Sequence, residues 1–87
     1  MYFVYIIKNS TGKLYIGISK NPKQRIQEHN SERGANFTKY TPTYRIVFLE
    51  KYSRLIEARR REIQIKKWRR EKKDMLINRY QQGLNTI

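Results

Sequence analysis

The seven residues YFVYIIK at positions 2–8 constrain the fold of this chain more than any other feature. Apolar side chains occupy both alternating sets of positions, so a strand here must bury both of its faces. Such a strand belongs in the centre of a sheet that is covered on each side. Because the chain has 87 residues, there is room for one small core, and we expect a single domain over residues 1–87.

A hairpin is predicted to join this central strand to a second strand at residues 13–19. The turn at Ser10–Gly12 suits a three-residue loop in which the glycine takes the left-handed conformation. This loop length sets Tyr5 opposite Gly17 and places both residues on one face of the sheet with Tyr15. A loop one residue shorter or longer would put the two tyrosines on opposite faces. We expect the glycine to leave open space across from the Tyr5 ring.

Helices are predicted on either side of a third strand at residues 44–52. The sequence Asn-Pro-Lys-Gln from position 21 is typical of a capped helix start and predicts a helix over residues 21–30. A long helix is predicted from position 53 to about position 73 or beyond, and DMLINRYQQG either continues it or forms a separate helix that ends at Gly83. The order β-β-α-β-α, with or without an extra C-terminal helix, defines an α+β fold: a small three-stranded antiparallel sheet flanked by helices.

The charge of the chain indicates its partner. Lysine and arginine number 20 against 7 aspartate and glutamate residues, which gives a net charge of +13. Nucleic acid is the usual partner of such a charge, and a membrane surface is the less favoured one. No apolar run has the ~20 residues of a transmembrane helix, the start has no signal-peptide pattern and cysteine is absent. We therefore expect a cytoplasmic protein that uses no membrane and no thiolate metal site.

Glu62 falls on the apolar stripe of the long predicted helix, in line with Leu55, Ala58 and Ile65. A carboxylate in such a stripe is costly to bury unless it is paired or holds a metal. Its oxygen ligands suit Mg²⁺ or Mn²⁺, and no second carboxylate stands at a partner spacing, so one metal is expected. The alternative is an ion pair with Arg59, Arg61 or Lys66.

Arg25 and His29 are four residues apart and therefore share one face of the first predicted helix. An arginine suits bidentate contact with a phosphate, and a neutral histidine can accept a proton near pH 7. The alternative is a solvated arginine and a surface histidine. Tyr5 is a poor base at an ordinary pKa of about 10, and we expect nearby cations such as Arg25 or Lys13 to lower its pKa.

These residues resemble the GIY-YIG nuclease family. Tyr15-Ile16-Gly17 matches the second half of the family motif, and Phe3-Val4-Tyr5 matches the first half with phenylalanine in place of the leading glycine. Arg25 and His29 match the helix pattern, Glu62 matches the acidic residue, and Gly34–Thr38 is similar to a segment of the small single-domain members. Asn78 is the candidate for the late asparagine of the family.

The resemblance implies a metal-dependent endonuclease. In it Tyr5, helped by His29, activates the attacking water, Tyr15 orients the water or contacts the phosphate, Arg25 steadies the phosphorane charge, and Glu62 holds Mg²⁺ or Mn²⁺. DNA is favoured over RNA, with selection by nucleic-acid structure or by a protein partner rather than by sequence. The alternatives are a non-catalytic nucleic-acid-binding module with the same fold and a basic structural protein.

Substrate contact is expected from the hairpin and from the basic run between Lys51 and Arg79, which holds twelve basic and four acidic residues. This basic run either contacts phosphates of the nucleic acid or forms a solvated helix face. Trp68 lies at the edge of the core stripe, where packing is favoured over stacking on an unpaired base. The residues expected to contact the substrate are Lys13, Gly17, Arg59, Lys66, Lys67 and Arg69.

Overall fold

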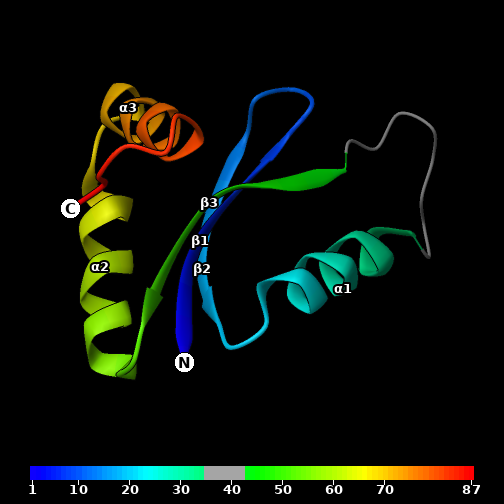
Figure 1. Cartoon of the computed structure of the whole chain (residues 1–87). Helices are drawn as coiled ribbons and strands as arrows, with labels where there is room; N and C mark the ends of the chain where they lie inside the picture. The colour runs from blue at the N-terminus through cyan, green and yellow to red at the C-terminus, as the bar shows by residue number, and fades with distance from the viewer. Residues whose placement is uncertain (35–42) are drawn as a thin grey trace.

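The structure, a computed structural model, describes residues 1–34 and 43–87, and only the backbone of residues 31–34. The element order is β-β-α-β-α-α, which confirms the predicted α+β class (Figure 1). The elements are β1 (Tyr2–Asn9), β2 (Leu14–Ser19), α1 (Pro22–Gly34), β3 (Tyr44–Tyr52), α2 (Leu55–Lys67) and α3 (Arg70–Gln81).

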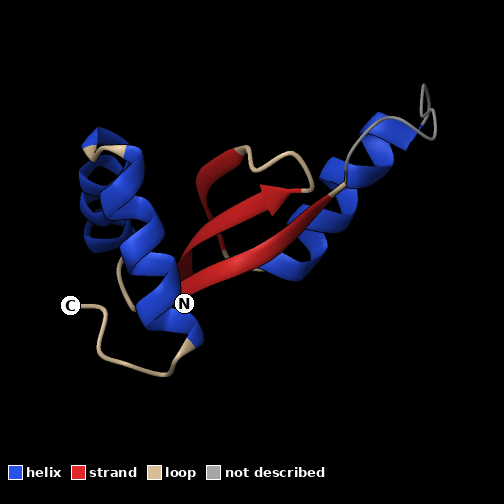
Figure 2. Cartoon of the chain, turned by 90° about the horizontal axis from the view of Figure 1, so that it is seen from above, coloured by secondary structure: helices blue, strands red, loops and turns tan. Residues whose placement is uncertain are grey.

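The central position predicted for residues 2–8 is confirmed. The antiparallel sheet has the order β2-β1-β3, and helices cover both of its faces (Figure 2). On one face Val4 and Ile6 of β1 pack in a cluster with residues of α2 and α3; on the other face Tyr5 and Ile7 pack with Ile26 of α1. Both faces of β1 are therefore buried, as its composition requires.

The predicted hairpin register is also confirmed. Tyr5 pairs with Gly17 and Ile7 pairs with Tyr15. Gly12 has φ +89°, which glycine adopts without strain. The Asn9 Oδ1 atom accepts hydrogen bonds from the Thr11 and Lys13 backbone amides and so fixes the loop. Tyr5, Tyr15 and Gly17 consequently share the face of the sheet that α1 covers.

A β-bulge in β3 was not predicted. Ile6 pairs with Phe48 whereas Ile7 pairs with Ile46, so Val47 is an extra residue in the ladder. The bulge lets the adjacent Val47 and Phe48 both enter the cluster under α2 and α3. Alternation along a single strand cannot show this, because the extra residue is defined only by the pairing.

The prediction of one long helix from position 53 to 73 is wrong. The chain leaves the helix at Trp68, whose backbone is extended (φ −72°, ψ 152°), and α3 begins at Arg70. Neither glycine nor proline marks this break. Packing explains it: Trp68 lies against the core, and the change of direction allows Leu76 and Ile77 of α3 to be buried against the sheet.

The ends of α1 and α3 test two further predictions. Asn21 caps α1 by accepting a hydrogen bond from the Gln24 amide at 3.2 Å, as predicted. The helix continues to Gly34, four residues beyond the predicted end at position 30. Most of the segment Gly34–Thr38, which resembles the small family members, lies outside the described residues. The predicted end at Gly83 is confirmed, with φ +74° and a Leu84 amide bonded to the Arg79 carbonyl.

Across the part of the chain that the structure describes, no helix combines the length and the apolar character that crossing a membrane requires.

Candidate active site

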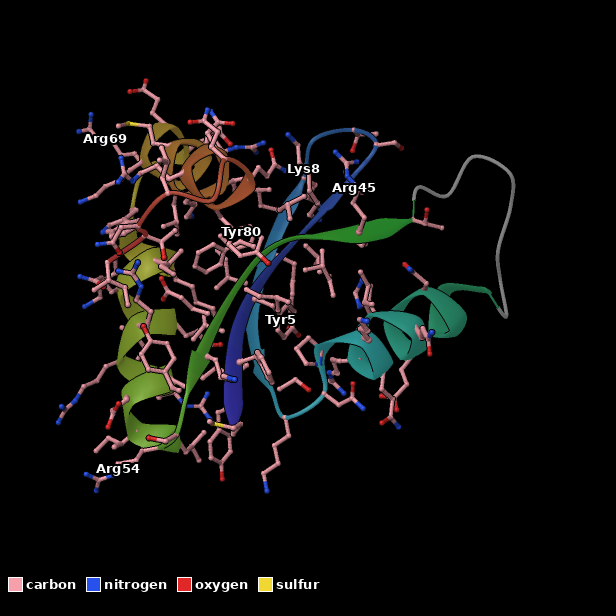
Figure 3. The ribbon with its side chains drawn as sticks, viewed as in Figure 1. Tyr5, Lys8, Arg45, Arg54, Arg69 and Tyr80 are labelled. Carbon is pink, nitrogen blue, oxygen red and sulfur yellow. The ribbon has the colours of Figure 1, made fainter. Side chains whose placement is uncertain are left out.

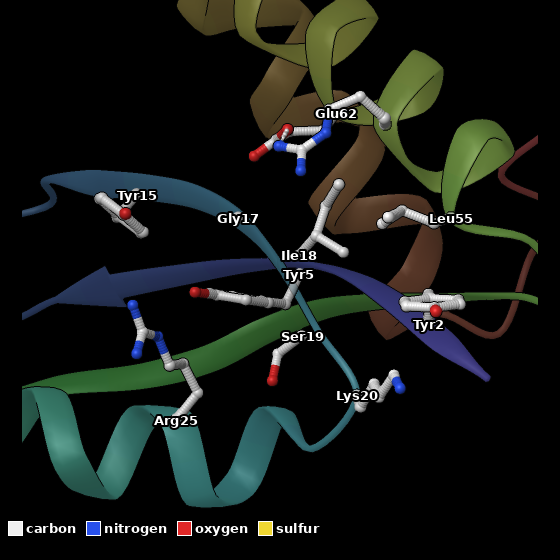
Figure 4. A pocket seen from close by; sticks show the side chains of 11 residues that line it. Tyr2, Tyr5, Tyr15, Gly17, Ile18, Ser19, Lys20, Arg25, Leu55 and Glu62 are labelled. Atoms are coloured by element: carbon white, nitrogen blue, oxygen red, sulfur yellow. Dashed lines mark hydrogen bonds and ion pairs between the residues drawn. The ribbon is translucent and has the colours of Figure 1, made fainter.

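A pocket of about 400 Å³ opens at the β2 edge of the sheet, between α1 and α2. The hairpin contributes Tyr5, Tyr15 and Gly17, α1 contributes Arg25, and α2 contributes Glu62 (Figure 4). We call it the tyrosine pocket. It brings together five residues that are separated by up to 57 positions in the chain, because β1 and β2 form its wall and both flanking helices supply charged side chains.

The Tyr5 phenol occupies the space beside Gly17. A Cβ atom built on Gly17 would lie 2.5 Å from the Tyr5 hydroxyl oxygen and 2.7 Å from Cζ. The expectation of open space opposite the Tyr5 ring is therefore wrong, since the ring itself fills that space. The glycine is needed so that a nearly buried tyrosine, 5% exposed, can lie across the edge strand with its hydroxyl in the pocket.

Replacing Gly17 by alanine should displace the Tyr5 ring and destabilise the fold by about 1–3 kcal/mol, the usual cost of overpacking. Urea denaturation measures the loss, and the Tyr5 ring resonances in NMR spectra report the displacement. The matched comparison is the Tyr5→Ala background, which removes the ring atoms that the added methyl group would meet. In a Tyr5→Ala background, Gly17→Ala should cost almost nothing. An equal cost in both backgrounds would contradict the steric explanation.

The pKa of Tyr5 moves in the direction opposite to the one predicted. Burial raises the pKa of the phenol above its ordinary value of 10.0, and the neighbouring Tyr15 raises it further. A hydrogen bond and the positive charge from Arg25 lower it without cancelling these effects, and the Glu62 charge adds to the rise. Tyr5 is therefore a protonated phenol at neutral pH in the absence of other cations.

Arg25 and His29 take different places although they share a side of α1. Arg25 reaches the tyrosine pocket, with its side chain 60% exposed and 3.8 Å from Glu28. The His29 ring lies behind Tyr15, at a centroid distance of 5.9 Å, and meets the Tyr44 ring edge to face at 4.9 Å. The Tyr5 ring lies on the other side of Tyr15, at a centroid distance of 6.5 Å. His29 therefore contacts Tyr15 and is not among the residues that line the pocket.

Glu62 is buried, with 6% of its surface exposed, as its position on the apolar stripe predicts. Its two oxygens are held separately, Oε1 by Arg59 at 3.3 Å and Oε2 by Lys66 at 3.2 Å. Two of the ion pairs considered from spacing are thus present. The third candidate, Arg61, instead binds Glu50 of β3 at 2.8 Å. Leu55, which shares the predicted apolar stripe with Glu62, is 43% exposed at the pocket rim.

The residues present fit a metal ion whose coordination is completed by water and substrate. Within the described residues no three side chains of histidine, cysteine, aspartate or glutamate are grouped, so a closed protein cage is not formed there. Mg²⁺ commonly uses one or two carboxylates together with waters and substrate phosphates. Glu62 can supply one such carboxylate, and any ion that binds it must compete with the Arg59 and Lys66 ion pairs.

The other residues expected to contact substrate divide into two groups. Arg59 lines the tyrosine pocket, and Lys66 reaches its edge by pairing with Glu62. Lys67 and Arg69 lie at the turn between α2 and α3, where they line a shallow surface beside Trp68. Lys13 is exposed in the hairpin loop and does not line the tyrosine pocket. Trp68 is half-buried against the core, and Lys72 lies 4.3 Å from its ring.

Lys20, Ser19 and Tyr2 line the tyrosine pocket and were not predicted. The Lys20 Nζ atom lies 5.3 Å from the centre of the Tyr2 ring. A usable signal existed, because Lys20 follows β2 directly and therefore stands at the same sheet edge as Gly17. Asn78, the candidate for the family asparagine, lies on α3 and lines a separate pocket.

Comparison with known proteins identifies relatives along most of the chain. The family profile described as "GIY-YIG catalytic domain" matches residues 1–80. A "UPF0213 protein" of Staphylococcus aureus is 42% identical over 76 residues, which are 87% of this chain and 93% of that protein. The solution NMR structure of the UPF0213 protein BH0048 from Bacillus halodurans is similar, with 32% identity and a TM-score of 0.58 over 90% of this chain and 84% of that one. The NMR structure of the protein EF2693 from E. faecalis has 27% identity and a TM-score of 0.66, over 92% and 85% of the two chains.

Proposed function

The chain belongs to the GIY-YIG family, and from this premise we propose that it is a metal-dependent endonuclease that hydrolyses phosphodiester bonds, in DNA rather than RNA. The observation that carries the proposal is the convergence of a phenol, a guanidinium and a carboxylate on one pocket. Tyr5, Arg25 and Glu62 come from β1, α1 and α2, and all three line it. A proton acceptor, a phosphate ligand and a metal ligand are the groups that hydrolysis of a phosphodiester requires.

In this proposal Tyr5 accepts the proton of the attacking water. Its hydroxyl faces the pocket from the floor, beside Gly17, where it cannot move far because the ring is buried. Tyr15, which is 48% exposed, contacts the water or the phosphate from the pocket wall. Arg25 neutralises charge that develops on the phosphorane oxygens, and its exposure leaves it free to reorient toward them. His29 helps to position Tyr15 through the contact between their rings.

Glu62 is the residue that would hold a divalent metal. Such an ion, Mg²⁺ or Mn²⁺, would supply positive charge to the leaving 3′ oxygen and to the environment of the Tyr5 phenol. The Arg59 and Lys66 side chains, now on the two carboxylate oxygens, are more than half exposed. Released from Glu62, both cations can turn to phosphates of the substrate, so one change frees the carboxylate and adds two substrate contacts.

The rate of cleavage should rise with pH through the neutral range. The Tyr5 pKa is raised above 10, so the reactive phenolate is a minor form whose fraction grows tenfold for each pH unit below that pKa. We therefore expect log kcat to increase with a slope near +1 from about pH 6.5 to about pH 9. A pH series in Mg²⁺ measures this slope, and Tyr5→Phe should flatten it. A pH-independent rate in the wild-type protein would contradict the assignment of Tyr5 as base.

The basic residues favour selection by nucleic-acid structure rather than sequence. Lysine and arginine side chains contact phosphates, and such contacts position a ligand without reading its bases. Of the described residues, the exposed cations around the pocket and the α2–α3 turn include Lys20, Arg59, Lys66, Lys67 and Arg69. We propose branched or flapped DNA as the substrate class, with a protein partner as an added source of selection.

A non-catalytic nucleic-acid-binding module is the second candidate. Two observations favour it: the pKa of Tyr5 is raised, and Glu62 is paired with two cations. A binding module would hold DNA equally well with chelator present and would leave every strand intact.

Incubation with supercoiled plasmid and with branched, flapped and linear DNA separates the two candidates. With Mg²⁺ or Mn²⁺ we expect strand cleavage that leaves 5′-phosphate and 3′-hydroxyl ends, and EDTA should stop it. A binding module should retard the same substrates on a native gel and yield no products. RNA versions of the preferred substrate test the choice of DNA.

A further inference from the structure

Two cations face each other across the sheet at the hairpin end of β1. Lys8 of β1 and Arg45 of β3 are direct antiparallel partners, so their side chains leave the same face of the sheet (Figure 3). Partners in this arrangement have Cβ atoms about 4.5–5.5 Å apart, and like charges placed there destabilise a sheet. Position along β1 puts Lys8 on the face of Val4 and Ile6, which is the face that α3 covers.

Neither cation is neutralised within the described residues. No ion pair joins Lys8 or Arg45 to any carboxylate among them. Asp74 of α3 is the carboxylate that lines the same pocket as the two cations, but it forms an ion pair with Arg70 at 3.0 Å. The local charge is therefore positive, and the arrangement has an electrostatic cost that a bound anion would remove.

These residues line a pocket of about 320 Å³ between the sheet and α3. Its floor is apolar, formed by Val47 and Ile77, and its rim carries the Asn78 and Gln81 amides, the two cations and the Asp74 carboxylate, which is neutralised by Arg70. Two positive side chains and two amide groups above an apolar floor are suited to a phosphate group, whose oxygens accept from all of them. We call this the strand-end pocket.

We propose that the strand-end pocket binds a backbone phosphate of the polynucleotide that the tyrosine pocket cleaves; the inference rests on the proposed function for the identity of this ligand. The backbones of Tyr5 and Lys8 are separated by about 10 Å along β1. Their side chains leave opposite faces of the sheet, Tyr5 toward α1 and Lys8 toward α3. One nucleic acid reaches both pockets only if it passes around the sheet, as the arms of a branched DNA can, with the second contact on an arm that is not cut.

The test compares K8Q/R45Q with the matched control K51Q/R54Q. Each removes one lysine and one arginine charge, and the control residues are exposed and line neither pocket. Fluorescence anisotropy with labelled branched DNA, in EDTA so that no strand is cut, gives Kd over a series of KCl concentrations. We expect K8Q/R45Q to bind more weakly and to reduce the slope of log affinity against log salt by about 1, since one phosphate contact contributes roughly 0.9. K51Q/R54Q should leave the slope nearly unchanged.

A second arm identifies the source of the phosphate. Side-chain amide resonances of Asn78 and Gln81 are followed by NMR during titration with inorganic phosphate and, separately, with a short DNA duplex. We expect saturable shifts with DNA only, and their loss in K8Q/R45Q. Shifts that saturate with inorganic phosphate, together with an unchanged salt slope for DNA, would overturn the proposal and indicate a site for free phosphate.

Thermal denaturation tests whether weaker DNA binding by K8Q/R45Q results from a loss of stability. Removing the facing charges should leave the Tm of K8Q/R45Q equal to or above that of the wild-type protein at low salt. A reduced Tm with an unchanged salt slope would show that the pair is structural and contradict the proposal. Cleavage by the wild-type protein is measured separately. If K8Q/R45Q has the reduced salt slope but the wild-type protein does not cleave DNA, the nuclease function alone is rejected. If the wild-type protein cleaves DNA but K8Q/R45Q has an unchanged salt slope, the strand-end pocket alone is rejected.

Discussion

Tyr5→Phe should reduce the rate of DNA cleavage by about 10²–10⁴-fold while leaving the fold and DNA affinity intact. This range is the usual contribution of a positioned general base. The substitution removes only the hydroxyl oxygen, and the ring that fills the space beside Gly17 remains. Single-turnover cleavage of branched DNA measures the rate, and anisotropy with the same DNA in EDTA measures the affinity.

Tyr80→Phe is the matched control for Tyr5→Phe. Tyr80 lies on α3, its ring contacts Phe48 at a centroid distance of 5.5 Å, and it does not line the tyrosine pocket. Its loss of a hydroxyl should change the cleavage rate less than twofold. If Tyr5→Phe cleaves as fast as Tyr80→Phe, the phenol is not the base, and Tyr5 serves only to pack the hairpin against α1.

Glu62→Gln should abolish metal-dependent cleavage, with a rate reduced by roughly 10³-fold or more, because a metal contributes several kcal/mol of charge stabilisation. The amide keeps the shape of the side chain but is a poor ligand for Mg²⁺. DNA affinity should be equal to or tighter than that of the wild-type protein, because Arg59 and Lys66 lose their charged partner. Both ion pairs have an exposed member, so the change in stability should stay within about 1 kcal/mol.

Glu57→Gln provides the charge-matched control for Glu62. Glu57 lies in the first turn of the same helix, is exposed and does not line the tyrosine pocket. Binding of Mn²⁺, measured by electron paramagnetic resonance in the presence of an uncut DNA analogue, should be lost in Glu62→Gln and kept in Glu57→Gln. Equal Mn²⁺ binding by the two variants would place the metal elsewhere.

The parts of the fold that local sequence determines were predictable. The loop at Ser10–Gly12 is only three residues long, and its length alone sets Tyr5 opposite Gly17. The Asn21 cap likewise depends on residues within one helical turn. The burial of Glu62 followed from helical spacing, because Ala58 and Ile65 lie on the same stripe.

Features that depend on distant contacts were not predictable. The break at Trp68 has no local signal, since it arises from packing of the α3 residues Leu76 and Ile77 against the sheet. The partner of Arg61 proved to be Glu50, eleven residues away on β3, although Glu62 is its direct neighbour in sequence. The pKa of Tyr5 depends on how deeply the assembled fold buries the phenol, and a list of nearby cations therefore gave the wrong direction.

The central claim is that the tyrosine pocket hydrolyses phosphodiester bonds with a metal held by Glu62. It is tested most directly by single-turnover cleavage of branched DNA by the wild-type protein and by Glu62→Gln, each with Mg²⁺ or Mn²⁺ and each with EDTA. We predict product from the wild-type protein with metal and from none of the other reactions. Product that forms at the wild-type rate in EDTA, or from Glu62→Gln with metal, would contradict the claim.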